Sequence, residues 1–180
     1  TPLWDHSSLT FTGIRSTSGA YTFLLAMISE DDYKKILSSL QALCARREYC
    51  PSEIRQKALS RIKAHLQDDE GQSAGALADR MTESLIGDSY VDSLRYAKAF
   101  ASEKSSLLGW GPYKISQALC TKQIDRQTIE EALGSLDAER AESKLEKLLR
   151  NKWKSLQDDP QGRFKLLRYA LSRGYEYDSS

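Results

Sequence analysis

Apolar residues recur at helical spacing over most of the chain, and the clearest example lies in residues 110–136. There Ile115, Ala118 and Leu119 fall on one face of a helix. This helix is expected to begin near Pro112, because proline suits a first helical turn, where its missing N–H would have no partner. A second short helix follows, capped by Asp125 and carrying the apolar residues Ile129, Ala132, Leu133 and Leu136.

The first of these two helices has related copies elsewhere in the chain. Residues 165–175 repeat the order of residues 114–124, and residues 53–62 resemble both but are one residue shorter. Helices of this length are marginal in water alone, because they cannot bury their own apolar face. Three related units at intervals of about 50 residues therefore predict a small solenoid, in which each unit closes the core of the next.

Further helices are predicted before residue 110. One is capped by residues 29–32, which include three acidic side chains, and another opens at residues 51–53. A third is expected to end at Gly87 in a left-handed turn, and Asp92 caps a fourth. Their inward apolar residues include Tyr33, Ile36, Leu40, Ile54, Ala58, Ile62, Leu77, Met81, Leu85, Ala97 and Ala101.

A third unit is expected after residue 136. A long helical pattern covers residues 138–156, and the acidic residues and proline at 158–160 break it. Another helix is expected from Tyr175 onward, but few residues remain, so this unit is predicted to be incomplete. Its apolar positions are Ala141, Leu145, Leu148, Leu149 and Leu156 in the first helix and Phe164, Leu167 and Leu171 in the second.

The first residues of the chain follow a different pattern. Nine of residues 1–26 are Ser or Thr, and they show no helical period. We expect residues 1–28 to be a leader, either translated ahead of a true start at Met27 or forming a poorly ordered arm. A β-hairpin is the competing interpretation.

Composition favours helix and does not indicate cross-links. Only 4 Pro and 10 Gly occur among 180 residues, and a chain of this length buries about 70% of its unfolded surface. The three cysteines and the two histidines have no zinc-ligand spacing, so we expect reduced cysteines, no metal and a cytoplasmic protein. The longest apolar run, around residues 23–28, is too short to span a bilayer.

We find no catalytic constellation in the sequence. A phosphate-binding glycine loop is absent, and two histidines leave little material for a catalytic triad. Glu130 and Glu131 are neighbours on a helix and point in different directions. His65 lies close to two aspartates in sequence, but a solvated helix end beside an acidic loop accounts for it. We therefore expect no enzyme and no cofactor.

Charge is balanced globally and polarised locally. The chain has 26 basic and 25 acidic residues, but residues 125–142 have a net charge of −4 and residues 144–173 a net charge of +6. An ordinary solvated helix face is one interpretation, and a surface for an acidic partner is the other. The basic residues of the second segment are Lys144, Lys147, Arg150, Lys152, Lys154, Arg163, Lys165, Arg168 and Arg173, interleaved with Trp153, Phe164 and Tyr169.

Residues 86–100, followed by 110–119 and later by 171–177, resemble the RecX family, and residues 46–50 extend the likeness. The resemblance covers roughly residues 29–177. It implies an all-α, elongated and curved array of tandem three-helix repeats, after an atypical non-helical leader. The expected helical domain is 29–180, with units at roughly 29–87, 88–136 and 137–180.

RecX proteins regulate the RecA recombinase, so the resemblance implies a monomeric, non-enzymatic regulator that binds RecA or the RecA–DNA filament and inhibits it. Such a protein modulates DNA repair and recombination in the SOS response. One rival is an autonomous helical DNA-binding protein using a basic C-terminal face, and another is a generic peptide-binding scaffold. The expected contacts to RecA or DNA are Lys98, Lys104, Lys114, Lys122, Arg126, Lys144, Lys147, Arg150, Lys152, Lys154, Arg168 and Arg173.

Overall fold

The computed structural model describes residues 28–65 and 71–176, and all regular secondary structure within them is helical. The predicted all-α class is confirmed. The leader up to Met27, with its rival hairpin, lies outside the described residues, as does most of the stretch after Tyr175. The helices are α2 (Glu30–Cys44), α3 (Pro51–Lys63), α4 (Gly71–Gly87), α5 (Ser93–Leu108), α6 (Pro112–Thr121), α7 (Arg126–Gly134), α8 (Ala138–Lys154) and α9 (Gly162–Ser172).

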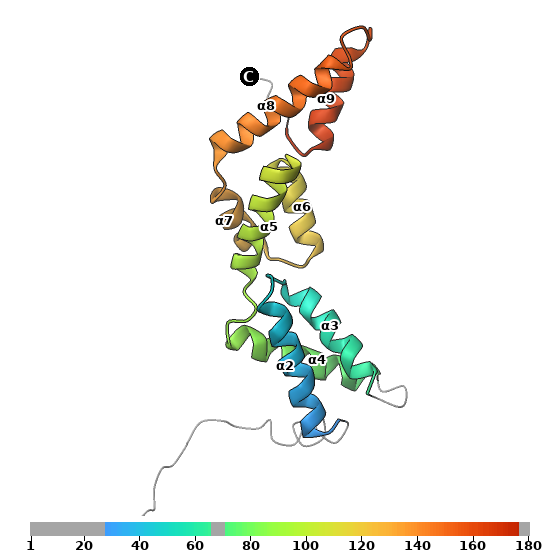
Figure 1. Ribbon diagram of the computed structural model, residues 1–180, viewed down its shortest axis with the longest axis vertical. Coiled ribbons are helices and arrows are strands. Elements are labelled where there is room, and N and C mark those ends of the chain that lie inside the picture. The colour runs from blue at the N-terminus through green and yellow to red at the C-terminus, as the bar shows by residue number, and fades with distance from the viewer. Residues whose placement is uncertain (1–27, 66–70, 177–180) are drawn as a thin grey trace, which may run out of the picture.

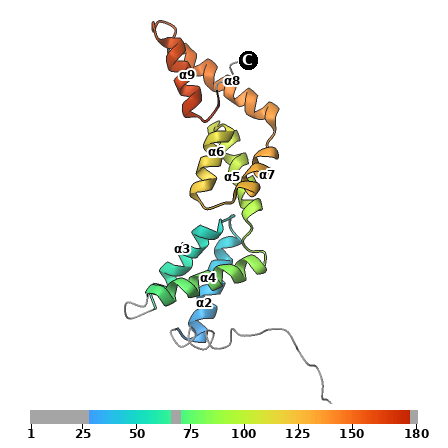
Figure 2. The same cartoon turned by 180° about the vertical axis from the view of Figure 1, so that it is seen from behind.

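The described helices form an elongated, bowed array (Figure 1). Helices α2, α3 and α4 pack together at one end, α5, α6 and α7 form the middle, and α8 and α9 lie at the other end. The view from behind shows the same order along the long axis (Figure 2). This arrangement agrees with the curved array of tandem helical units that the sequence predicted.

Side-chain caps fix the start of four of these eight helices. Ser29, Asp92, Asp125 and Asp137 each accept a hydrogen bond from the backbone N–H three residues on, at 2.8 to 3.1 Å. Such a cap satisfies one of the free amides of the first turn. The caps at Asp92 and Asp125 confirm the sequence prediction, and α3 and α6 instead begin with the expected proline.

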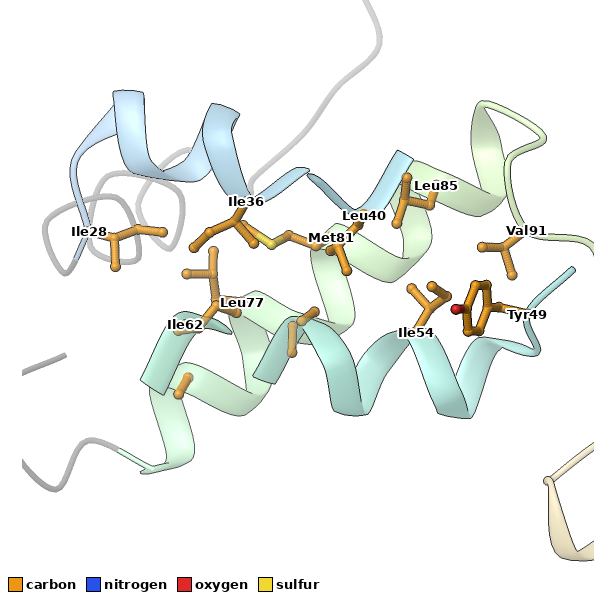
Figure 3. Packing of buried hydrophobic residues seen from close by; sticks show 13 residues of the cluster. Ile28, Ile36, Leu40, Tyr49, Ile54, Ile62, Leu77, Met81, Leu85 and Val91 are labelled. Atoms are coloured by element: carbon orange, nitrogen blue, oxygen red, sulfur yellow. The ribbon is translucent and has the colours of Figure 1, made fainter. Parts of the chain in front are cut away.

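The first core lies between α2, α3 and α4 (Figure 3). Leu40, Ile54, Met81 and Leu85 are fully buried there, and Ile28 also belongs to this cluster with 5% of its surface exposed. Burying a side chain of this size contributes about 1.5–3 kcal/mol. Three amphipathic helices that are individually too short to be stable therefore hold one another in place.

The second core belongs to α5, α6 and α7 and includes one residue from the first group. Ile115 and Leu119 of α6 are fully buried, and Ile129 of α7 is 2% exposed. Cys50, which directly precedes α3, packs in this second cluster and is also fully buried. The first two helical groups are therefore joined through a shared apolar contact.

The predicted left-handed turn at Gly87 is wrong. Gly87 is the last residue of α4, and Ser89 adopts the left-handed conformation, with φ +60°. The same conformation occurs at Gln123, which follows α6, and at Gly174, which follows α9. After each of these three residues, the N–H of the following residue donates to the carbonyl of the residue five positions before that donor. Serine and glutamine thus adopt the left-handed conformation that glycine usually supplies at a helix end. A glycine near the end of a helical pattern therefore does not by itself locate the closing turn.

The predicted inward face of α9 is also wrong in part. Phe164 and Leu171 are 59% and 47% exposed, whereas Leu166, Leu167 and Ala170 are half-buried. Leu166 and Ala170 occupy the repeat positions of Ile115 and Leu119 in α6. The repeat register therefore identifies the half-buried face of α9 better than the local apolar pattern does.

Candidate partner-binding surfaces

Helices α3, α6 and α9 are each the second helix of their unit. The end of α9 contacts the start of α6, and the end of α6 contacts the start of α3. The N–H of Gly111, just before α6, donates to the carbonyl of Arg173 at 2.7 Å, and the N–H of Tyr113 donates to that of Gly174 at 3.3 Å. A Cβ on Gly111 would lie 2.4 Å from the Gly174 carbonyl oxygen. The start of α6 and the end of α9 thus touch through backbone, which requires glycine at this position.

A related junction joins the end of α6 to the start of α3. The Ser52 hydroxyl donates to the carbonyl of Lys122 at 2.8 Å, and the Lys122 ammonium pairs with Glu53. Burial alone would lower the pKa of Lys122, but hydrogen bonds with Glu53 and Tyr96 raise it to about 12. Lys122 therefore stays charged at neutral pH and helps to hold two units together.

Several of the predicted contact residues have intramolecular partners in the middle of the array. Lys98 of α5 pairs with Glu131 of α7 at 2.9 Å, and Lys104 pairs with Glu103 at 2.7 Å. Lys114 donates to the Ser172 carbonyl at 2.9 Å and lies over the Trp110 ring. These bonds give the three lysines structural roles, and their roles as partner contacts stay predictions.

The remaining predicted residues lie toward the C-terminal end and on the surface. Arg173 donates to the Leu108 carbonyl at 2.5 Å and stacks over Tyr169, so it also joins units. Arg126 pairs with Glu130 within α7, on the exposed surface. Lys152 and Arg168 each lie 6.0 Å from the centroid of an aromatic ring of α9.

Helix α8 presents one strongly basic face. Lys147, Arg150 and Lys154 are exposed and follow one another at three- and four-residue spacing, so they line one side of the helix. Arg150 pairs with Glu146, while Lys147 and Lys154 have no ion pair within the described residues. Lys144 is half-buried and lies next to Gly109. The structure thus brings Lys147, Arg150 and Lys154 together as one solvent-facing patch, the α8 patch.

Sequence reasoning did not select a second basic surface, at the junction of the first two units. Arg47, Lys57 and Arg61 line a hollow of about 470 Å³ along α3. A signal was available, since Lys57 and Arg61 are four residues apart and therefore share a helix face. Charged residues on a helix face are ordinary in proteins, so this spacing alone does not mark a binding site.

The described residues contain neither a cluster of metal ligands nor a membrane-spanning helix. No group of three or more His, Cys, Asp or Glu side chains among them could hold a metal ion. None of the described helices is both long and apolar enough to cross a lipid bilayer.

Known proteins resemble this chain in domain, sequence and fold. Residues 92–133, which cover α5, α6 and all but the last residue of α7, match the family model described as RecX, second three-helix domain. The chain is 25% identical over 146 residues to the "Regulatory protein RecX" of Salmonella paratyphi A, covering 81% of this chain and 87% of that protein. The protein of the same name from Salmonella typhimurium is 24% identical to this chain over 147 residues, which cover 82% of this chain and 88% of that protein.

A solved structure shares the fold. A chain described as "Crystal structure of regulatory protein RecX" superposes with a TM-score of 0.68 at 19% identity, covering 92% of this chain and 75% of that one. This chain thus shares its overall fold with a RecX protein. The matched domain and the relatives make this chain similar to RecX proteins in sequence, and the solved structure makes it similar to one in fold.

Proposed function

We propose that this protein is a non-enzymatic regulator that binds RecA or the RecA–DNA filament and inhibits its recombinase and ATPase activities. The observation that carries the proposal is the match of the middle unit to a RecX domain, together with relatives named regulatory protein RecX over most of the chain. In this role the protein would act in the cytoplasm as a monomer and modulate DNA repair and recombination.

The shape and charge of the array support this role. A bowed array of stacked helical units presents a long continuous surface, which suits a polymeric partner such as a filament. The α8 patch adds positive charge at one end of that surface. A regulator of this kind needs no catalytic group, because a difference in affinity between two filament states is enough to shift their populations. The unit boundaries at roughly 29–87, 88–136 and 137–180 are part of this proposal.

The decisive experiment titrates the protein into RecA ATPase and strand-exchange reactions on single-stranded DNA. Inhibition well below one protein per RecA, with weak binding to bare DNA, supports the regulator. Inhibition that appears only when the protein saturates the DNA indicates simple competition and contradicts it.

Charge reversal tests the α8 patch within this proposal. Lys147→Glu, Arg150→Glu and Lys154→Glu together should weaken inhibition strongly while leaving the far-UV circular dichroism unchanged. A matched control reverses three exposed lysines of the first unit, Lys34, Lys35 and Lys63, and so changes the net charge equally. If both triple variants inhibit like the unchanged protein, the α8 patch has no part in regulation.

An autonomous DNA-binding protein remains the alternative, and the lysines of the α8 patch without ion pairs are the observation that favours it. Phosphate contacts make affinity fall linearly with salt on a logarithmic scale, with a slope of about −0.7 per contact on single strands. Tight binding to bare DNA with a steep dependence of affinity on salt would favour this alternative over the regulator. The α8 triple variant should then lose the part of the salt slope that about three phosphate contacts contribute.

A further inference from the structure

Two hollows adjoin at the junction of the first and middle units. The first, of about 470 Å³, follows the surface of α3, and the second, of about 440 Å³, lies between the α2–α3 connection and α5. Arg47 and Glu53 line both, so the hollows form one groove, the junction groove. Its other lining includes Lys57 and Arg61 of α3 and Lys104 of α5.

Each carboxylate of the junction groove has one ionic partner, and Glu48 Oε2 is buried without a hydrogen bond. Glu48 pairs with Arg95 at 2.6 Å, Glu53 pairs with Lys122, and Glu103 pairs with Lys104. Three cations of the lining, Arg47, Lys57 and Arg61, have no ion pair within the described residues. The groove lining therefore holds two more cations than carboxylates.

Aromatic rings hold these cations in position. The Arg47 guanidinium lies 4.2 Å from the centroid of the buried Tyr49 ring, and the Lys57 ammonium lies 5.3 Å from the same centroid. In the second hollow, Lys104 and Lys122 lie 5.2 and 5.9 Å from the Phe100 centroid. Cation–π contacts of this kind restrain a flexible side chain before a ligand arrives.

The same contacts distinguish between two anionic ligands. Single-stranded nucleic acid is usually held by bases that stack on open aromatic faces. Here the rings of Tyr49 and Phe100 face cations of the protein itself, which leaves charge, not stacking surface, for a ligand. The pairs of Lys104 with Glu103 and of Lys122 with Glu53 show in addition that carboxylates fit cations of this groove.

We propose that the junction groove binds an extended acidic segment of a partner protein, with Asp or Glu carboxylates meeting Arg47, Lys57 and Arg61. Because the groove is lined by α3 and by α5, such a segment bridges the first and middle units. The inference does not depend on the identity of the partner, so it stands or fails separately from the proposed action on RecA.

The test measures fluorescence anisotropy of a labelled oligo-glutamate peptide on the full chain at low salt, with oligo-glutamine as the neutral probe. We expect the acidic peptide to bind, the neutral peptide not to bind, and added salt to weaken the complex. The double variant Lys57→Glu/Arg61→Glu should reduce affinity by roughly ten-fold or more, because like charges then face the peptide. Lys63→Glu, on the same helix but outside the lining, should change affinity less than about two-fold.

A milder variant separates binding from folding. Lys57→Gln/Arg61→Gln removes charge without repulsion, and it should weaken binding while circular dichroism and the melting temperature stay close to those of the unchanged protein. Equal affinity of the double variants and the Lys63→Glu control would overturn the proposal. So would the absence of peptide binding, or a labelled single-stranded oligonucleotide that binds through the same two residues while the peptide does not.

Discussion

The middle unit and the C-terminal pair of helices use the same repeat but differ in how they bury it. In the middle unit α7 covers α5 and α6, and Ile115 and Leu119 are fully buried. In the C-terminal pair α8 has no buried residue, and the equivalent positions of α9, Leu166 and Ala170, are only half-buried. An amphipathic pattern therefore specifies a helix, but its burial depends on the helices around it.

The C-terminal pair depends correspondingly more on its junction with the middle unit. The side chain of Leu148 in α8 occupies the space that a Cβ on Gly109 would need, and Arg173 donates a hydrogen bond to the Leu108 carbonyl. Within the described residues no ion pair joins α8 to α9, whereas Arg55 and Asp79 join α3 to α4. The stability of this end is thus expected to follow the junction, while that of the other units follows their cores.

The largest effect should come from opening the middle core. Leu119→Ala is expected to lower the free energy of unfolding by about 2–5 kcal/mol, because it removes buried apolar surface and leaves a cavity. Leu149→Ala, in half-buried α8, should cost only about 1 kcal/mol. Urea unfolding followed by circular dichroism measures both. Similar losses would mean that the C-terminal pair is as well packed as the middle unit.

The next effect should come from the junction of α6 with α9. Gly111→Ala is expected to cost about 2 kcal/mol, because its Cβ meets the Gly174 backbone, which cannot rotate away. Amide hydrogen exchange should show Gly111, now Ala, and Tyr113 losing protection while α2 to α4 keep theirs.

Gly134→Ala is the matched control. A Cβ at Gly134, the last residue of α7, meets nothing within 4 Å. The substitution should be neutral or stabilise by about 0.5–1 kcal/mol, since alanine has less freedom to lose on folding. If Gly111→Ala behaves in the same way, the backbone contact between α6 and α9 does not hold the C-terminal pair.

The other junction should respond less. Lys122→Met keeps the aliphatic stem but removes the charge that pairs with Glu53, and it should cost about 1–2 kcal/mol at neutral pH. Because folding raises the pKa of Lys122 from 10.5 to about 12, its stabilisation is fully present below pH 10.5 and is lost as the pH rises through 12. The difference between variant and unchanged protein should therefore be constant near neutrality and shrink in strong alkali.

Lys98→Met is the control for this junction. The Lys98–Glu131 pair joins helices within one unit and is about half exposed, so its loss should cost under about 1 kcal/mol. Equal costs for both substitutions would show that Lys122 is an ordinary surface pair and not a link between units.

Local sequence rules predict where the helices lie in the chain, but they do not predict which face of each helix is buried. The caps at Asp92 and Asp125 follow from side-chain chemistry within four residues, so the sequence could predict them. The left-handed residue at Ser89 could not be read from residue type, because glycine two positions earlier is the usual candidate. The local apolar pattern places Phe164 and Leu171 on the inward face of α9, whereas the repeat indicates Leu166, which is the residue that is half-buried.

The candidate surfaces were harder to predict, because most of their geometry joins distant residues. Lys98 and Glu131 are 33 positions apart, and Lys122 and Glu53 are 69 apart, so their pairing needs the fold. Clustering of Lys147, Arg150 and Lys154 was visible, since one helix carries all three. The junction groove needs Arg47 and α5 together, which only the packing of the first and middle units provides.

The smallest effect concerns acid stability of the first unit. The hydrogen-bonded Arg55 guanidinium lowers the pKa of Asp79 below 3.8, so this pair stabilises the protein above that pH and stops doing so as the pH falls through the lowered value. Both side chains are nearly half exposed, which keeps the contribution small. Asp79→Asn should therefore lower the melting temperature slightly at pH 7 and match the unchanged protein in strong acid. Glu146→Gln, which breaks only a pair within α8, should leave this difference unchanged, and a melting temperature of Asp79→Asn that equals the original at every pH would show that packing alone joins α3 to α4.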